Sequence, residues 1–429
     1  MSVVARQSFK YSIIGYLGFL LGMVSAVFIF PSDLTYYGKL RYILPAAQMY
    51  MTVVVFGLSF SNVYFFGRLK EVNKQQNFLS WSLLLVAINF VVFTGGFFAI
   101  FYFFPDLKKD SQLWNLRKII VPLILILSLS SVFNKYISNF KRIVVPNIFE
   151  NLFPKIANLL AFSLFFYLGF QEYFSFLAFF FIFVLAFFGY IIYTNKLEKI
   201  HLDFSTDYLK KNHFWKEVFS YSFYGFLGNL GSVLALNISS YMIGESIGME
   251  ENGVYSTIFS IVQLISIPAM GLYNISAPII RKHIAEKTIK DLDIYYKKTS
   301  LSLFFLGLVL FSCIAVGYPY LTEFMPKAGK SLLEAQPLIW VIGFALLFEL
   351  ATGFNGHIIS MSKYYRFNIY VMLFLAVLTT VLNFYFIHKT SLGILGISIS
   401  YAISLTAFNL AKIAFNYYKF KVSPFTIEM

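Results

Sequence analysis

Long apolar stretches separated by short polar segments run along the whole chain. Each is long enough for a transmembrane α-helix, which needs about 20 predominantly apolar residues. The strands of a membrane barrel would read instead as alternating segments of roughly 10 residues. We therefore predict an all-α, multi-pass membrane protein with about twelve spans, at residues 9–30, 43–66, 78–104, 114–133, 144–167, 174–193, 218–243, 254–280, 301–321, 332–361, 367–387 and 392–415.

The longest polar interruption, at residues 194–217, divides the spans into two sets of six. This pattern predicts an N-terminal lobe over residues 1–195, a cytoplasmic linker over residues 196–217 and a C-terminal lobe over residues 218–429. An even number of helices in each lobe gives the two lobes the same orientation in the membrane. Substrate sites of transporters built in this way usually lie between the halves.

Two short similarities indicate that the second lobe repeats the first. Residues 11–18 and 221–228 are identical at five of eight positions, at an offset of 210. The pattern F-N-x-x-I at residues 133–137 recurs at residues 354–358, at an offset of 221. Because the two matches come in the same order and at similar offsets, we expect two pseudo-symmetric six-helix lobes.

The composition excludes a soluble globular protein. Hydrophobic residues make up 59% of the chain and charged residues 13%, whereas ordinary soluble domains carry about 25% charged residues. The formal net charge is +14. With the N-terminus in the cytoplasm, the cytoplasmic segments hold 23 Lys and Arg residues and the outer segments 9. This asymmetry predicts cytoplasmic termini and contact with anionic headgroups, not with nucleic acid.

The polar segments carry no recognisable catalytic or metal-binding motif. The five histidines are isolated, and the single cysteine, Cys313, lies in an apolar stretch. Gly329, Lys330 and Ser331 resemble the end of a phosphate-binding loop, but Phe324 stands where such a loop needs its first glycine. We therefore expect a transporter rather than an enzyme, with no cofactor and no metal.

Polar residues inside the spans are the candidate functional residues, because an ionisable side chain at membrane depth costs roughly 2.5 to 3.5 kcal/mol. Lys155 shares one helical face with Asn147, Asn151 and Asn158, at spacings of 4, 4 and 3 residues. It lies about 16 Å into its span at 1.5 Å per residue. Lys155 either lines a polar cavity or is satisfied by Glu150 or by neighbouring carbonyl groups.

The last span repeats this arrangement with Asn409, Lys412 and Asn416 on one face. Lys412 either lines the cavity or reaches the headgroups from a position near the helix end. Glu349, near the middle of the tenth span, either takes up a proton or forms a structural ion pair. Asparagines of the seventh span either line the same space or bond between helices. The predicted substrate-cavity residues are Lys155, Lys412, Asn151, Asn158, Asn229, Asn237 and Asn409, with Glu349 as the candidate for proton or ion coupling.

Three segments resemble those of a known family. Residues 30–38, FPSDLTYYG, are similar to an "LGPxxYG" turn, with Phe30 for its Leu and Pro31 for its Gly. Residues 253–256, GVYS, resemble the start of that family's second lobe, and residues 392–396, LGILG, its "GILGA" ending. On these segments the chain is identified as resembling the polysaccharide flippases, of the O-antigen (Wzx-like) type, in the MOP exporter superfamily with its MATE-like transporters.

The resemblance implies a V-shaped bundle that moves an undecaprenyl-diphosphate-linked oligosaccharide across the bacterial inner membrane. Membrane lipids and the polysaccharide polymerase machinery would be its partners. In that family cationic cavity residues are thought to meet the diphosphate, and Lys155 and Lys412 suit this role by depth. One alternative is an ion-coupled multidrug or small-molecule antiporter of the same fold. Another is a membrane polymerase or ligase, although the longest outer loop covers only residues 105–113.

Overall fold

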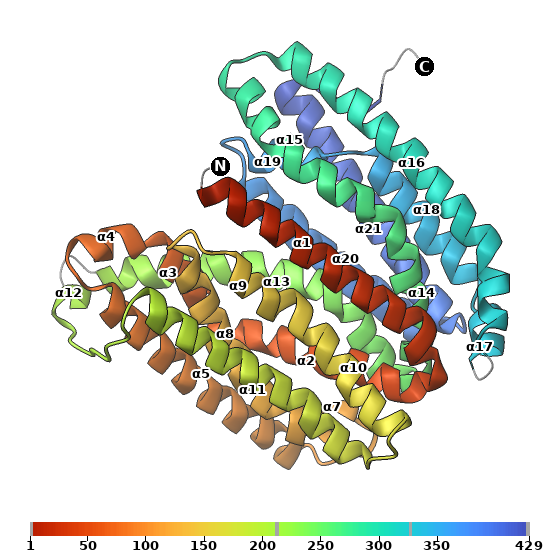
Figure 1. Cartoon of the computed structure of the whole chain (residues 1–429), viewed down its shortest axis with the longest axis horizontal. Helices are drawn as coiled ribbons and strands as arrows, with labels where there is room; N and C mark the ends of the chain where they lie inside the picture. Colours follow the sequence, from red (N-terminus) through yellow and green to blue (C-terminus); the bar gives the residue numbers. More distant parts are fainter. Residues whose placement is uncertain (1–2, 211–213, 326–327, 426–429) are drawn as a thin grey trace. The chain divides into compact units, whose positions relative to one another are not determined.

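The computed structural model describes residues 3–210, 214–325 and 328–425, and over these ranges its regular structure is helical throughout (Figure 1). Ten continuous helical segments among the described residues are long and apolar enough to cross a membrane. Two helices that meet at a bend, Leu34–Val55 and Leu58–Tyr64, make an eleventh span if they are taken together. The helix at Pro337–Ala351 is apolar but has only 15 residues. These segments coincide with the twelve predicted spans. The prediction of an all-α membrane protein with about twelve spans is therefore confirmed, with ten to twelve spans in the described residues.

The chain forms two compact units. Unit 1 contains Met1–Ser25 and Leu40–Val233, and unit 2 contains Ala26–Lys39 and Leu234–Met429. Two helices belong to both units, because one unit boundary falls inside each of them. They are α2 (Leu34–Val55) and α13 (Phe214–Ser246). The lobe boundaries expected from the sequence remain a prediction.

Unit 1 is built around α8, which packs against helices that precede and follow it in the chain. More than half of its most apolar window is buried, compared with 11% for α5. The helix pair α10 and α11 continues this packing, and α1 lies along α9 and α10 (Figure 1). The unit contains α1 (Val3–Val24), α3 (Leu58–Tyr64), α4 (Phe66–Glu71), α5 (Gln75–Phe103), α6 (Leu107–Asp110), α7 (Gln112–Asn115), α8 (Arg117–Ser138), α9 (Val144–Asn147), α10 (Phe153–Phe166), α11 (Glu172–Leu197) and α12 (Asp207–Lys210).

Unit 2 is built around α18, which packs against α14, α16 and α21. The last two long helices, α20 and α21, form an antiparallel hairpin beside it (Figure 1). The unit contains α14 (Met249–Val262), α15 (Ile267–Ala285), α16 (Ile289–Glu323), α17 (Gly329–Glu334), α18 (Pro337–Ala351), α19 (Asn355–Ser360), α20 (Arg366–Lys389) and α21 (Gly393–Phe420).

The second predicted span is a broken helix. Helices α2 and α3 meet at an angle of 59°, and Phe56 and Gly57 between them have φ values of 47° and 74°. A Cβ atom at Gly57 would lie 1.9 Å from the carbonyl oxygen of Ser222 on α13. The hydroxyl groups of Ser61 and Ser222 are hydrogen-bonded at 2.7 Å. The break at Gly57 therefore allows the backbone of α13 to approach.

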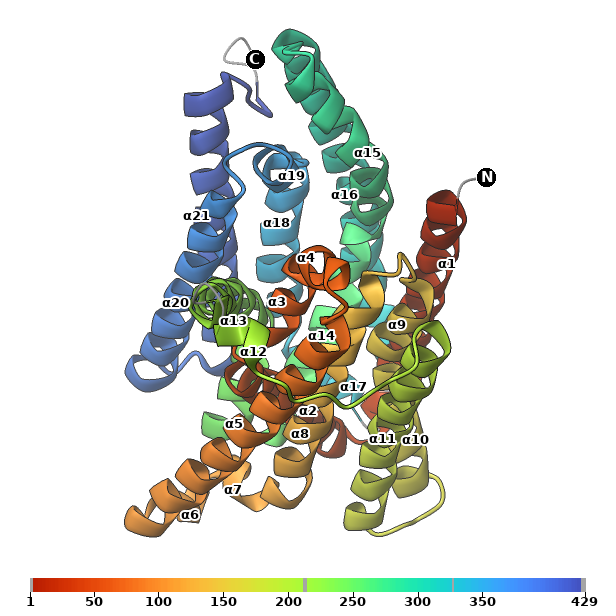
Figure 2. The same cartoon turned by 90° about the vertical axis from the view of Figure 1, so that its left-hand side faces the viewer.

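Residues 198–205 of the segment expected to be a linker pack onto the ends of α5 and α8 in unit 1 (Figure 2). Residues 211–213 of that segment lie outside the described residues. Lys74 pairs with Asp203 at 3.3 Å, and the side chain of Asn77 donates to the carbonyl oxygen of Ser205 at 3.0 Å. The backbone N–H of Ser205 donates to Asp203, and this hydrogen bond is the largest cause that lowers the pKa of Asp203 to about 2. The segment is thus held to the helix ends by specific contacts.

Candidate functional site

The tenth predicted span is broken inside unit 2, and buried polar residues, among them Thr352 and Asn355, lie at this break. Helix α18 ends at Ala351, Gly353 has a φ of +55°, and α19 begins at Asn355. A Cβ atom at Gly353 would lie 2.3 Å from the hydroxyl oxygen of Ser300. Glycine is therefore required here both by the backbone conformation and by the close neighbour.

Side chains from other helices satisfy the carbonyl groups that the break releases. The hydroxyl group of Tyr296 donates to the carbonyl oxygen of Thr352 at 2.9 Å, and that of Tyr273 to Gly353 at 3.0 Å. The amide group of Asn416 donates to the carbonyl oxygen of Asn355 at 2.9 Å. Backbone groups of a broken membrane helix need such partners because lipid supplies none.

Three side chains at the break bond to one another. The amide group of Asn355 donates to the Oδ1 atom of Asn409 at 2.8 Å and to the hydroxyl of Thr352 at 3.0 Å. The Thr352 hydroxyl also lies 3.2 Å from Asn409 Oδ1. Asn409 in turn donates to the carbonyl oxygen of Leu405 at 3.0 Å. This network ties α19 to α21.

Lys412 lies one turn further along α21, on the same face as Asn409 and Asn416. Its side chain is 9% exposed, and its Nζ atom lies 3.6 Å from the centre of the Phe408 ring. A Cβ atom at Gly356 would lie 2.9 Å from the same Nζ atom. The predicted shared face of Asn409, Lys412 and Asn416 is thus present in the structure.

The immediate charge partner of Lys412 is an aromatic face rather than a carboxylate. Among the described residues no carboxylate oxygen lies within 4.0 Å of its Nζ atom. Glu349 on α18 interacts with Lys412 electrostatically from a greater distance. Helix α21 continues to Phe420, eight residues past Lys412, and so extends beyond the predicted span boundary at residue 415.

Lys155 on α10 lies against α1 in unit 1. The methylene groups of Lys155 lie against α1, where a Cβ atom at Gly22 would come within 3.2 Å of Lys155 Cε. A Cβ atom at Gly18 would lie 3.4 Å from Lys155 Nζ. Arg41 interacts electrostatically with Lys155. Two cations therefore face the same region of unit 1, and Gly18 and Gly22 leave the space that Lys155 occupies.

Glu150 is not the charge partner of Lys155. Its electrostatic partner is Lys135 on α8, and the Glu150 side chain is exposed in the structure. Glu150 lies within a π-helical turn at Ile148–Leu152, whereas Lys155 lies in the regular helix α10 that follows it. Such a turn changes the direction in which successive side chains point.

The predicted asparagines have different local roles. Asn151 bonds to Asn147, and the Oδ1 atom of Asn158 is buried without a hydrogen-bond partner. Asn229 donates to the hydroxyl of Thr52 at 3.3 Å inside unit 1. Asn237 is partly buried in the part of α13 that belongs to unit 2. The structure therefore brings together Lys155 with Asn151, and separately Lys412 with Asn409 and Glu349.

Sequence reasoning missed three residues that complete the cluster around Asn409 and Lys412. Thr352, Tyr273 and Tyr296 are not singled out by helical spacing, because they act through backbone carbonyl groups at the break. The available signal is the sequence TGFNG at residues 352–356. Two glycines that flank a Phe-Asn pair inside an apolar span are typical of a local interruption.

Comparison with known proteins identifies the fold. No protein-family model and no curated protein matches the chain. An inward-facing multidrug resistance MATE family transporter of the MOP superfamily matches with a TM-score of 0.73 at 14% identity, over 98% of this chain and 95% of that chain. The lipid II flippase MurJ, in an inward closed conformation, matches with a TM-score of 0.69 at 15% identity, over 96% of this chain and 88% of that chain.

A third similar structure is a MOP superfamily transporter from Pyrococcus furiosus, for which a reverse polarity of the binding pocket suggests a different function. It matches with a TM-score of 0.61 at 15% identity, over 97% of this chain and 95% of that chain. These proteins are transporters and a flippase rather than enzymes. The chain therefore has the MATE-like fold of the MOP superfamily transporters.

Proposed function

We propose that the chain is a flippase for a lipid-linked oligosaccharide. Its substrate is an undecaprenyl-diphosphate-linked repeat unit of O-antigen, capsule or exopolysaccharide, which it carries across the bacterial inner membrane by alternating access. The observation that carries this proposal is Lys412, a buried ammonium group beside an asparagine network with no carboxylate within 4.0 Å among the described residues.

The chemistry of the substrate explains why such a lysine is useful. A diphosphate cannot enter hydrocarbon without replacement of its water shell. A buried lysine supplies a charge-assisted hydrogen bond, and the asparagine amides around it supply further polar groups. Because Lys412 contacts the face of Phe408 instead of a carboxylate, an incoming phosphate does not have to displace a strong ion pair.

Lys155 and Arg41 supply a second cationic region, in unit 1. The two positive charges close to one another repel, and an anionic ligand relieves this repulsion. The asparagines on the face of α10 suit the sugar hydroxyl groups, which both donate and accept hydrogen bonds. In this proposal Lys155, Asn151 and Asn158 are the candidate substrate contacts of unit 1, and Lys412 and Asn409 are those of unit 2.

Similarity of fold supports a lipid-linked substrate, since the lipid II flippase has the same fold.

The polymerase machinery that consumes the flipped glycan is the proposed partner. Both termini are proposed to lie in the cytoplasm, on the basis of the distribution of basic residues.

An ion-coupled multidrug antiporter is the second candidate. Glu349 favours it, because an acidic group deep in the bilayer binds either a proton or a cationic drug. A multidrug transporter also shares the fold. In the flippase proposal, Glu349 acts instead as the group that couples proton or ion movement to transport through its interaction with Lys412.

Proteoliposomes that contain the purified protein separate the two candidates. A fluorescent undecaprenyl-diphosphate oligosaccharide should move between leaflets, and its headgroup should become accessible to a quencher outside. Lys412→Ala should slow this movement at least tenfold. Lys419→Ala changes an exposed lysine on the same helix and should leave the rate unchanged. Transport of a cationic dye without movement of the lipid would favour the antiporter and reject the flippase.

A further inference from the structure

A cavity of about 520 Å³ lies inside unit 2, at the polar end of α16. Lys297, Lys298 and Ser300 line one part of it, and Leu301 and Phe304 line the adjacent part. The C-terminal segment Pro424–Phe425 forms another wall. Polar and apolar groups thus meet within one cavity, and Ala351, which also lines it, directly precedes Thr352 at the end of α18.

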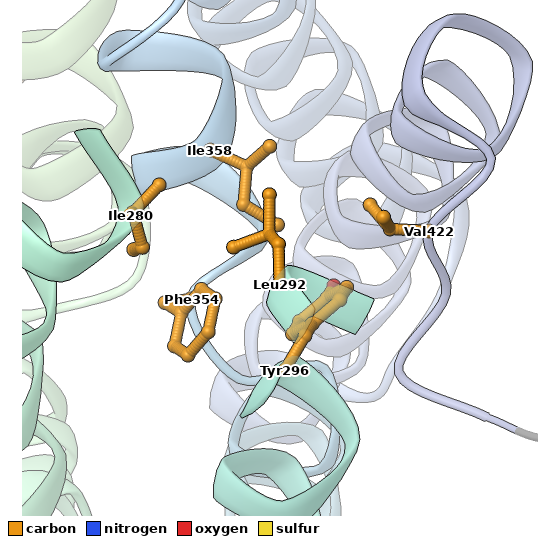
Figure 3. Close-up of a cluster of buried hydrophobic side chains, with 6 residues drawn as sticks. All are labelled: Ile280, Leu292, Tyr296, Phe354, Ile358 and Val422. Atoms are coloured by element: carbon orange, nitrogen blue, oxygen red, sulfur yellow. The ribbon is translucent and has the colours of Figure 1, made fainter. Parts of the chain in front are cut away.

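The wall formed by the C-terminal segment is held in place. Val422 is fully buried in a hydrophobic cluster with Ile280, Leu292, Tyr296, Phe354 and Ile358 (Figure 3). The backbone N–H of Ser423, the next residue, donates to the carboxylate of Asp293 at 3.0 Å. These two contacts fix the chain immediately before Pro424 and Phe425, which line the cavity.

The two lysines differ in their partners. Lys297 forms an ion pair with Asp293 at 2.6 Å. Lys298 is exposed, and among the described residues no carboxylate oxygen lies within 4.0 Å of its Nζ atom. The cavity therefore has one compensated cation and one cation whose charge is available to a ligand.

A buried hydroxyl group adds to this polar wall. Ser300 is 2% exposed and lines the cavity, and its Oγ atom has no hydrogen-bond partner in the structure. A buried polar atom without a partner costs about 1 to 3 kcal/mol. An oxygen atom of a bound molecule would supply the missing partner.

The cavity spans the boundary between the polar and apolar parts of α16. The charged residues at the start of this helix end with Lys298, and an apolar surface follows, on which Leu301 is 46% exposed and Phe305 is 55% exposed. A membrane places its phosphate groups at such a boundary, with hydrocarbon directly beside them. A phospholipid has a phosphate group directly beside its acyl chains, and it therefore matches a charged surface that is followed by an apolar one.

We propose that this cavity binds one anionic phospholipid, with its phosphate group at Lys298 and Ser300 and one acyl chain along Leu301 and Phe304. The uncompensated charge of Lys298 favours an anionic over a zwitterionic headgroup. The bound lipid would fasten the C-terminal segment to α16. This binding does not depend on which substrate the protein transports.

Native mass spectrometry of the full chain in detergent tests the proposal by titration with phosphatidylglycerol, with phosphatidylcholine and with inorganic phosphate. We expect one tightly bound phosphatidylglycerol. Lys298→Glu should weaken its binding about thirtyfold, because the change reverses a charge near an anionic group. Lys290→Glu alters an exposed lysine on the same helix outside the cavity and should change the affinity less than threefold.

Two further variants separate binding from folding. Ala351→Leu fills part of the cavity without a change of charge and should also release the lipid. Ser300→Ala should weaken phosphatidylglycerol binding several-fold, while the thermal stability of the lipid-free protein is unchanged or higher. Equal affinity for phosphatidylcholine, saturation of the site by inorganic phosphate, or full binding by Lys298→Glu would each overturn the proposal.

Discussion

Gly38 and Gly253 cross with their backbones in contact, and the contact is reciprocal. A Cβ atom at Gly38 would lie 1.7 Å from the carbonyl oxygen of Met249, and one at Gly253 would lie 2.0 Å from that of Leu34. Each glycine is the fifth residue of its helix, and Leu34 and Met249 are the first residues of α2 and α14. The amide of Asn252 also donates to the carbonyl oxygen of Gly38 at 2.8 Å. Two segments that resemble family motifs thus meet inside unit 2.

This crossing predicts a large loss of stability for either Gly→Ala substitution. Overpacking of a well-packed site costs typically 1 to 3 kcal/mol, and here the obstructing atoms belong to backbone that cannot rotate away. Gly38→Ala and Gly253→Ala should lower the thermal unfolding temperature in detergent by several degrees. Gly96→Ala is the matched control, because no atom lies within 4 Å of its Cβ position. Equal stability of Gly38→Ala and Gly96→Ala would contradict the predicted obstruction.

Lys155→Ala should abolish export of the surface glycan in cells that depend on this protein, at an unchanged protein level. The ammonium group of Lys155 lies beside Gly18 and its methylene groups lie against Gly22, so the substitution removes a cation together with this contact to α1. Glycan export is measured by surface labelling, and the protein level by immunoblot. Lys196→Ala alters an exposed lysine at the end of α11 and should export normally. Normal export by Lys155→Ala would show that Lys155 is not needed for contact with the substrate.

Asn355 and Asn409 should be energetically coupled. Asn409→Ala leaves the Asn355 amide without the acceptor that it contacts at 2.8 Å, and an unsatisfied buried donor costs about 1 to 3 kcal/mol. In a double-mutant cycle, the loss of stability of Asn355→Ala with Asn409→Ala should be smaller than the sum of the single losses by about 1 kcal/mol. Chemical denaturation in a mild detergent measures the three values. Strict additivity would show that the hydrogen bond contributes nothing.

The contact of the 198–205 segment with α5 should weaken in acid. The pKa of Asp203 is lowered to about 2 in the folded protein, so its carboxylate stabilises the contact above the ordinary pKa of about 3.9. This contribution is lost as the pH falls toward 2. Asp203→Asn should remove the same contribution at neutral pH, because Lys74 then loses its ion pair.

Hydrogen exchange at neutral pH measures this effect directly. Backbone amides of residues 198–205 should exchange faster in Asp203→Asn than in the unchanged protein. Asp207→Asn is the control, since Asp207 lies at the start of α12. Its exchange pattern in residues 198–205 should match that of the unchanged protein. Equal exchange in Asp203→Asn and in the unchanged protein would show that the other hydrogen bonds of the segment hold it to α5.

The hydrophobic pattern determined the membrane spans and the faces of individual helices. A transmembrane helix satisfies its backbone hydrogen bonds within its own segment, so its existence depends on local sequence. For the same reason, helical spacing placed Asn409, Lys412 and Asn416 together, and all three are buried on one face of α21.

Only contacts between helices decided which partners these candidate residues have. The spacing rule could not show that Asn355 bonds to Asn409, that Glu150 interacts electrostatically with Lys135, or that a break at Gly353 exposes carbonyl groups to Tyr273 and Tyr296. Each of these features joins residues from different helices. Their partners are set by how the helices pack, because lipid offers polar groups no alternative to a protein partner.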